Sequence, residues 1–223
     1  DERLAGEFLR LGGELHTKSR IPREGREGLV WAAGRKAEKE SEWLGLKVHV
    51  EGLAMEADLE MHVGEAGYLG LAPVEGERVN ACGLFRRRDG VTGKGVKLLE
   101  GYLAANGLEG LAGRLRAAEA DERSFTGVSA FRLGRQEAED GMCVLGAAES
   151  MIPPFTGNGM SMAFEAADSA VGPMGDYAAG RGSWEETMER LRERLQARFR
   201  RRLFTARLLH PFLFSTAGRS ALT

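Results

Sequence analysis

One short segment contains the most specialised backbone in the chain. In "IPPFTGNGM", prolines that fix φ are followed by glycines that permit positive φ and by an asparagine that tolerates it: Pro153, Pro154, Gly157, Asn158 and Gly159. From Met160 the sequence becomes helix-forming, so the glycines lie at a predicted helix N-terminus. Such an N-terminus presents unpaired N–H groups and partial positive charge, and small residues let a ligand approach them.

Two familiar ligand loops do not fit this segment. A phosphate loop needs a Lys and a Ser or Thr after its glycines, and a dinucleotide fingerprint needs a third glycine where Met162 stands. A tight turn before a core helix is the alternative to a ligand site. We expect the helix to point its N-terminus into a cleft between two units and to pack an apolar stripe on buried strands, through Met160, Ala163, Phe164 and Ala167.

Composition and charge exclude several classes of function. With 223 residues, 43% of them hydrophobic, and a formal charge of -2, the chain predicts a globular protein without general affinity for nucleic acid. Cys82 and Cys143 are too few for a disulfide scaffold, and the cysteines and four histidines lack metal-ligand spacing, so we expect no metal. No apolar run approaches the roughly 18 residues of a membrane span, and the first residues contain no signal-peptide core. From the small number of cysteines we expect a reducing, cytoplasmic setting.

Two segments, one near the N-terminus and one around residue 145, indicate α/β structure. A helical stripe near the N-terminus stops at Gly12-Gly13, and residues 14–21 then suggest a strand. The short apolar runs at 28–34 and 142–149 are typical of buried strands, and we expect residues 29–33 and 142–146 to share one sheet. The sheet begins without its first strand.

The middle of the chain predicts antiparallel strands instead. Apolar and polar residues alternate at 46–50 and 59–63, and "YLGLAPV", "RVNACGLF" and "SFTGVSAF" continue the series. Within this region one or two helices are broken at Asn106-Gly107. A long helix over 183–207 carries eight arginines, for which a solvated face is the first interpretation and a weak membrane-surface contact the second.

These elements predict an α+β fold with an incomplete Rossmann-like α/β unit, an inserted antiparallel sheet and C-terminal helices. We divide the chain into residues 1–41, the antiparallel unit 42–135, the resumed α/β unit 136–182, and an Arg-rich helical segment 183–223.

The order of these elements around "GAAESMIPPFTGNGM" resembles the flavoprotein monooxygenase and geranylgeranyl reductase superfamily over nearly the whole chain. In that superfamily a Gly-Asp motif at a strand end reaches the ribityl chain of FAD, and the loop that follows lies against the flavin ring. Gly146, Ala147 and residues 153–160 match these motifs. A second motif, usually with Asp-Gly, is similar to "WAAGRKA", with Gly34 and Arg35 in place.

The resemblance implies FAD as cofactor and assigns roles to the loop. Gly157, Asn158, Gly159 and Met160 are expected to contact the isoalloxazine ring through the backbone, because helix N-terminal amides stabilise the negative charge of reduced flavin. The two prolines are expected to hold the loop rigid. The antiparallel sheet is expected to be the substrate domain.

Three departures from the superfamily pattern predict a truncated flavoprotein. Ala147 and Ala33 replace the two motif aspartates, and Glu149 is the nearest carboxylate that could substitute for the first. No Gly-x-Gly-x-x-Gly precedes Gly34, so the first strand and the pyrophosphate-binding helix are missing from the sequence. We therefore expect this chain to retain FAD only weakly.

Polar residues on the strands are the candidate substrate contacts. Lys47, His49, His62 and Asn80, with Glu60 and Cys82 beside them, fall on the polar phase of their strands. Each one taken singly is more often a residue that faces water. His49 and His62 have the further property of titrating near neutrality.

Two functions remain open from the sequence. In the first, an FAD-dependent oxidoreductase of the monooxygenase or reductase type takes electrons from NAD(P)H and acts on an apolar or aromatic small molecule, with no catalytic side chain identified. In the second, the chain is a non-catalytic relative that serves as a folding or interaction module, which the alanines at 33 and 147 favour.

Overall fold

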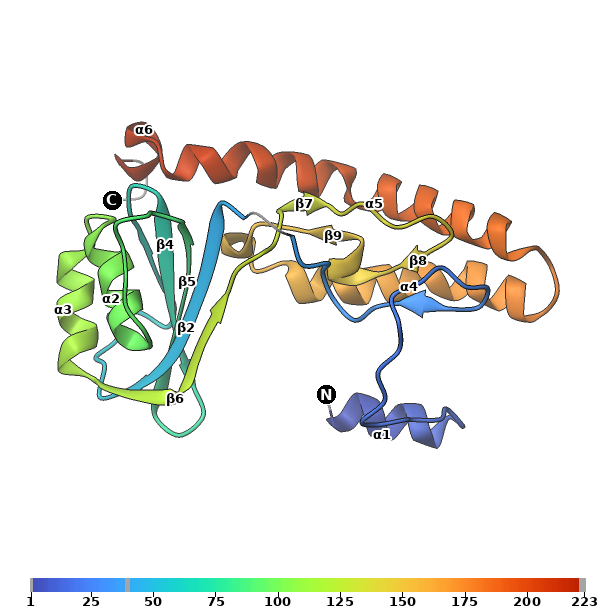
Figure 1. Ribbon diagram of the computed structural model, residues 1–223, viewed down its shortest axis with the longest axis horizontal. Coiled ribbons are helices and arrows are strands. Elements are labelled where there is room, and N and C mark those ends of the chain that lie inside the picture. The colour runs from blue at the N-terminus through green and yellow to red at the C-terminus, as the bar shows by residue number, and fades with distance from the viewer. Residues whose placement is uncertain (1, 39–40, 221–223) are drawn as a thin grey trace.

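The computed structural model describes residues 2–38 and 41–220. A five-stranded sheet with two helices lies at one end of the molecule, and a pair of long helices extends from it to the other end (Figure 1). Among the described residues no helix is both long enough and apolar enough to span a membrane.

The larger sheet is antiparallel throughout and has the order β3-β4-β5-β2-β6. Its strands are β2 (Trp43–Glu51), β3 (Glu60–Val63), β4 (Gly67–Val74), β5 (Arg78–Arg86) and β6 (Glu119–Val128). The two alternating segments, 46–50 and 59–63, are thus strands of one antiparallel sheet, as the sequence predicted.

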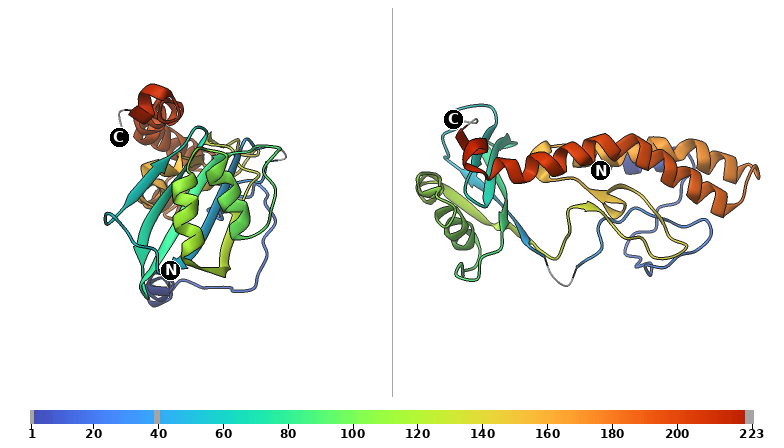
Figure 2. Two further views of the ribbon diagram at one scale, coloured as in Figure 1. Left: turned by 90° about the vertical axis from the view of Figure 1, so that its left-hand side faces the viewer. Right: turned by 90° about the horizontal axis from the view of Figure 1, so that it is seen from above.

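Two helices cover one face of this sheet (Figure 2, left). Helix α2 (Val96–Ala104) and helix α3 (Glu109–Ala117) are separated at the predicted break, where Gly107 has a φ of +75°. The Asn106 side chain is buried there, donating to the Tyr102 carbonyl at 2.7 Å and accepting from the Ala66 amide at 2.8 Å. The break is therefore tied to the sheet, and the core beneath includes Leu46, Val48, Leu69, Phe85, Leu99 and Leu103.

The second unit contains a very short parallel pair. Strand β1 (Val30–Trp31) pairs with β8 (Cys143–Val144), and the Leu145 amide continues the ladder to the Trp31 carbonyl at 3.0 Å. Residues 29–33 and 142–146 therefore lie in one sheet, as expected. Helix α1 (Glu2–Arg10) buries no residue.

The strand expected at residues 14–21 is wrong. The segment is irregular and exposed along its whole length, because no described strand lies beside it to accept its backbone hydrogen bonds. Alternation alone does not make a strand when the partner is missing.

Helix α4 (Gly159–Ala178) begins where expected, but its buried face is not the predicted one. Met160 is 79% exposed and Phe164 is 61% exposed, whereas Met162, Ala166 and Ala170 are buried. Those three residues face helix α5 (Trp184–Leu213), and their small alanines let the two helices pack closely. The prediction of a helix is confirmed, but the prediction of which face of the helix is buried is wrong.

Helix α5 connects the two units (Figure 1). It begins at the capping residue Ser183 and runs beyond the predicted end at 207, and α6 (Thr216–Ser220) follows it. Leu191, Leu195 and Phe199 pack in the core with α4, and His210 near the other end reaches an aromatic cluster on the sheet. A pair of two-residue strands, β7 (Gly134–Arg135) and β9 (Ser150–Met151), completes the unit.

Candidate functional site

The carboxyl ends of β1 and β8 lie side by side because the two strands are parallel. Gly34 follows the first strand, and Gly146 with Ala147 follows the second, in the 3₁₀ turn η1 (Gly146–Ala148). A Cβ added at Gly146 would lie 3.5 Å from the Ala163 Cβ in α4, so this edge adjoins the first turns of that helix. Ligands of open α/β sheets bind at this edge.

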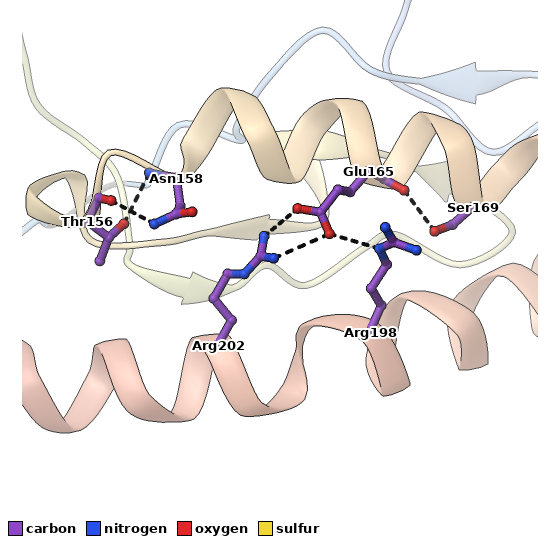
Figure 3. A network of polar contacts seen from close by, with 6 residues as sticks. All are labelled: Thr156, Asn158, Glu165, Ser169, Arg198 and Arg202. Atoms are coloured by element: carbon purple, nitrogen blue, oxygen red, sulfur yellow. Dashed lines mark hydrogen bonds and ion pairs between the residues drawn. The ribbon is translucent and has the colours of Figure 1, made fainter.

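The loop before α4 turns back on itself and is closed by its own hydrogen bonds (Figure 3). In the 3₁₀ turn η2 (Pro154–Thr156), the Thr156 hydroxyl donates to the Pro153 carbonyl at 3.0 Å. Gly157 follows with a φ of +64°, and the Asn158 Nδ2 donates to the Thr156 carbonyl at 2.6 Å. Because the Asn158 side chain is directed into the loop, it does not cap the helix.

The start of α4 is consequently open. No side chain of a described residue caps it, and its first turn contains no acidic residue. Four residues of this site are exposed: Ala147, Gly157, Gly159 and Met160. Two others, Gly146 and Asn158, are partly buried, and Pro153 is buried. The arrangement offers free amide donors and partial positive charge to an anionic or electron-rich group.

The Arg35 side chain is directed toward the segment that follows β6, away from the edge where Gly34 lies. Its guanidinium lies over the Phe131 ring at 5.6 Å and donates to the Ser129 carbonyl at 3.2 Å. The side chain thus ties the segment after β1 to the segment after β6.

Tyr68 joins the antiparallel sheet to the loop, and sequence reasoning missed it. Its hydroxyl accepts a hydrogen bond from the Phe155 amide at 2.9 Å, and the two rings meet edge to face at 6.3 Å. Burial raises the pKa of Tyr68 well above its ordinary value, so the phenol stays neutral. The only sequence signal was an aromatic residue near the start of a strand.

His210 packs at the centre of the same aromatic cluster, which we name the junction cluster: Trp43, Tyr68, Phe155, His210 and Phe214. Its ring lies 4.7 Å from that of Trp43 and stacks on that of Phe155 at 5.7 Å. Burial lowers the pKa of His210 to about 4, and its Nε2 has no hydrogen-bond partner among the described residues. The imidazole is therefore neutral at physiological pH.

Glu165 fixes α4 to α5 just behind the open helix start (Figure 3). It accepts from Arg202 at 2.7 Å and from Arg198 at 2.8 Å, and these hydrogen bonds hold its pKa below the ordinary value. The ion pairs set the position of the helix that presents the amides.

Glu149 does not take the place of the missing motif aspartate. It is buried and accepts from the Arg135 Nε at 3.2 Å, on the side where β7 pairs with β9. The exposed edge therefore has only the methyl group of Ala147 where that motif has a carboxylate.

Four candidate substrate residues share the sheet face that carries Tyr68. The register pairs Lys47 with Cys82 and His49 with Asn80, on the face opposite α2 and α3. Cys82 on β5 and Lys47 on β2 lie one row further along the strands than Tyr68, a rise of about 7 Å, and on successive neighbouring strands. His49 and Asn80 lie a further row out. Burial and the charge of Lys47 lower the pKa of His49.

His62 lies on the other face of the sheet. Register pairs Glu60 with Leu71 and His62 with Leu69, and both leucines belong to the core beneath the helices. Glu60 accepts from Arg114 of α3 at 2.9 Å and contacts the His62 Nε2 at 2.7 Å, and the Arg114 hydrogen bond is the main reason that the Glu60 pKa falls to about 2. These residues form a structural ion-pair network, so His62 is separated from the other candidates.

Two cavities lie away from the start of α4. A groove of about 530 Å³ lies between α5 and β8 and is lined by Arg135, Cys143, Glu149 and Arg192 among others, while one of about 440 Å³ lies beside Arg23 and Trp31. Within the described ranges no group of three His, Cys, Asp or Glu side chains could hold a metal ion.

Comparison with known proteins identifies the fold. No family model and no curated protein matches the sequence. Among solved structures, FqzB matches with a TM-score of 0.68 and 14% identity over 96% of this chain and 60% of its own. The flavin-dependent brominase Bmp2 gives 0.66 and 16% over 86% and 52%, and Klebsiella pneumoniae HpxO, complexed with FAD and uric acid, gives 0.56 and 17% over 84% and 51%.

The chain thus has the fold seen in FAD-dependent monooxygenases and halogenases, in agreement with the superfamily resemblance of its motifs. It spans between about half and three fifths of the length of these three structures. At such low identity the likeness extends to the fold alone.

Proposed function

We propose that this chain supplies the flavin-ring side of an FAD-dependent oxidoreductase, of the monooxygenase or reductase type, whose substrate is an apolar or aromatic small molecule. Bound FAD would supply the redox chemistry, with NAD(P)H as the electron source. The fold and the loop motif support this proposal. We also propose a cytoplasmic location, with which two free cysteines are compatible.

The observation that carries the proposal is Gly159, the first residue of α4. Its backbone does not have the positive φ that favours glycine, and a Cβ added there meets no atom within 4 Å. Neither backbone conformation nor internal packing therefore requires a glycine at this position. Gly175 in the same helix shares both properties, but only Gly159 lies at the uncapped helix start. We propose that close approach of a ligand to that start is the reason for Gly159, because a flat ring with negative charge suits the free amides there.

The residues of the site fit the ring of FAD better than its other parts. Gly157, Gly159 and Met160 offer an open surface at the carboxyl edge of the parallel pair, and the amides of Gly159 and Met160 are free among the described residues. Ala147 offers no acceptor for a ribityl hydroxyl, and Glu149 is paired elsewhere. We therefore propose that affinity resides on the ring side and that FAD is not retained through purification.

The junction cluster supports the class of substrate. Trp43, Phe155 and Phe214 place aromatic rings where the sheet meets the loop, and the face beyond Tyr68 continues to Lys47. An aromatic or apolar molecule would find ring contacts there, with an ammonium group one row away.

Ligands that divide FAD into its halves test the proposal. Riboflavin contains the ring without the pyrophosphate, so the 223-residue chain should bind riboflavin about as well as FAD and should not bind ADP. Quenching of flavin fluorescence measures the first two affinities, and competition measures the third. If ADP competes with FAD and riboflavin does not bind, or if the purified chain carries near-stoichiometric FAD, the proposal is wrong.

A matched pair of variants tests the position. Gly159→Val should weaken riboflavin binding about tenfold or more, because the side chain fills the approach to the amides. Gly175→Val is the control: it lies in the same helix, and a Cβ there also meets no atom within 4 Å. Equal losses in the two variants would contradict the site.

The alternative is a non-catalytic interaction module. Ala147, together with the Arg135 pairing of Glu149, favours this alternative because the site has no carboxylate at that position. Failure of the wild-type chain to bind riboflavin would support it.

A further inference from the structure

The outer face of α5 near its C-terminus carries a row of exposed apolar side chains. Phe204 is 63% exposed, Leu208 is 58% exposed and Phe212 is 47% exposed, and Leu209 lies beside them. The spacing of four residues aligns the first three along the helix. We name these four residues the α5 ridge.

The α5 ridge is a surface feature rather than an edge of the core. Leu195, Phe199, Ala206 and His210 form the buried side of the same helix. Seen from above, α5 runs uncovered along the molecule (Figure 2, right). Large apolar side chains gathered on an exposed face mark an interaction site more often than scattered ones do.

Positive charge flanks the ridge. No Asp or Glu occurs from Arg194 to the end of the chain. Arg200, Arg201 and Arg207 are exposed and have no hydrogen bond or ion pair to any described residue, whereas Arg198 and Arg202 are paired with Glu165. The three arginines are thus available to an external anionic partner.

Two other helices expose apolar residues but lack this charge pattern. On α1, Phe8 follows Glu7, which is paired with Arg10. On α4, exposed Phe164 and Val171 have exposed Asp168 between them. Only on α5, among the described helices, do exposed apolar residues occur with arginines and without acidic residues nearby.

We propose that the α5 ridge binds the surface of an anionic lipid bilayer. The helix lies in the plane of the membrane with its four apolar side chains at the boundary of headgroups and acyl chains, and Arg200, Arg201 and Arg207 contact lipid phosphates. Apolar and electrostatic contributions are both needed, because either one alone gives marginal membrane binding. This proposal does not depend on FAD binding.

Vesicle co-sedimentation of the 223-residue chain tests the proposal. Binding to phosphatidylcholine vesicles that contain about 30% phosphatidylserine should be about tenfold or more tighter than binding to pure phosphatidylcholine, and it should weaken in high salt. The double variant F204S/L208S should lose binding to both kinds of vesicle. Thermal unfolding measured by circular dichroism should be little changed, because both side chains are exposed.

Charge variants separate lipid binding from general electrostatics. R200Q/R201Q/R207Q should weaken binding to anionic vesicles by about 100-fold, from about fivefold for each arginine, equivalent to ~1 kcal/mol each. The control K94Q/K97Q/R123Q removes three exposed positive charges from the sheet unit and should change binding by about twofold or less.

Three results would overturn the proposal. The first is no preference for anionic vesicles, and the second is an equal loss in the two triple variants. The third is a dimer in sedimentation that F204S/L208S dissociates, without lipid binding by the wild-type chain, since the ridge would then join two copies.

Discussion

The two long helices begin in opposite ways. Helix α5 starts with a complete capping box, in which Ser183 accepts from the Glu186 amide at 3.1 Å and Glu186 accepts from the Ser183 amide at 2.9 Å. Helix α4 starts after a left-handed glycine, and its N-cap residue Asn158 bonds back into the loop. At the α5 start the amides of Ser183 and Glu186 are satisfied by side chains. At the α4 start the amides of residues 159–161 have no hydrogen-bond partner among the described residues.

This contrast helps to separate structural residues from candidate functional ones. At the start of α5, residue types are explained by bonds within the protein. At the start of α4, Gly159 is explained by neither conformation nor packing. If the start of α5 is structural and the start of α4 binds a ligand, substitutions in the two helices should have different effects on stability and on riboflavin binding.

The largest expected effect concerns the C-terminal end of α5, where His210 is buried in the junction cluster. Its folded pKa of about 4 is below the ordinary value of 6.5, so as pH falls through this window the unfolded chain binds a proton that the folded chain does not. The free energy of unfolding should therefore decrease between about pH 6.5 and about pH 4, by up to about 3 kcal/mol.

His210→Phe keeps an aromatic ring in the cluster and removes the titration. Urea unfolding of both proteins across this pH range measures the difference, and the variant should lose that part of the pH dependence. The same slope in both proteins would show that the anchoring of α5 is not pH-dependent through this residue.

The second prediction concerns the loop before the open helix. Gly157 has a φ of +64°, so Gly157→Val should destabilise the fold by about 2 kcal/mol and weaken riboflavin binding. Gly157→Asn is the control, because asparagine tolerates this conformation. Thermal unfolding and fluorescence titration measure the two effects. If valine and asparagine behave alike, the left-handed turn does not constrain the loop.

The smallest effect comes from removing each N-cap side chain. Ser183→Ala should cost about 1 kcal/mol without changing riboflavin affinity, because the hydroxyl caps a helix distant from the site. Asn158→Ala removes no capping bond and should cost only about 0.5 kcal/mol. Chemical denaturation measures the loss of unfolding free energy in the two variants. A larger loss for Asn158→Ala than for Ser183→Ala would contradict the conclusion that α5 is capped by a side chain and α4 is not.

Local chemistry explains what could be predicted from the sequence. The tight turn before α4 follows from its prolines and glycines, the break at Asn106-Gly107 from a left-handed residue, and the antiparallel strands from alternation. Each of these depends on residues that are near one another in the chain.

Features that depend on distant neighbours could not be predicted. The exposed position of Phe164 results from α5 occupying the other side of α4, and the position of His62 results from the register of β3 on β4. The contact between Tyr68 and Phe155 joins residues 87 positions apart. Contacts between residues so far apart in the sequence cannot be predicted from the residues on either side of each one.

If the amides at the start of α4 form the flavin-ring site, amide NMR of the 223-residue chain during a riboflavin titration should detect binding at those amides. We expect saturable shifts of the amide signals of Gly159, Met160 and Ser161, and unchanged signals for Ser183 and Glu186, whose amides are occupied in the capping box. Equal shifts at both helix starts, or shifts confined to other parts of the molecule, would contradict this assignment of the site.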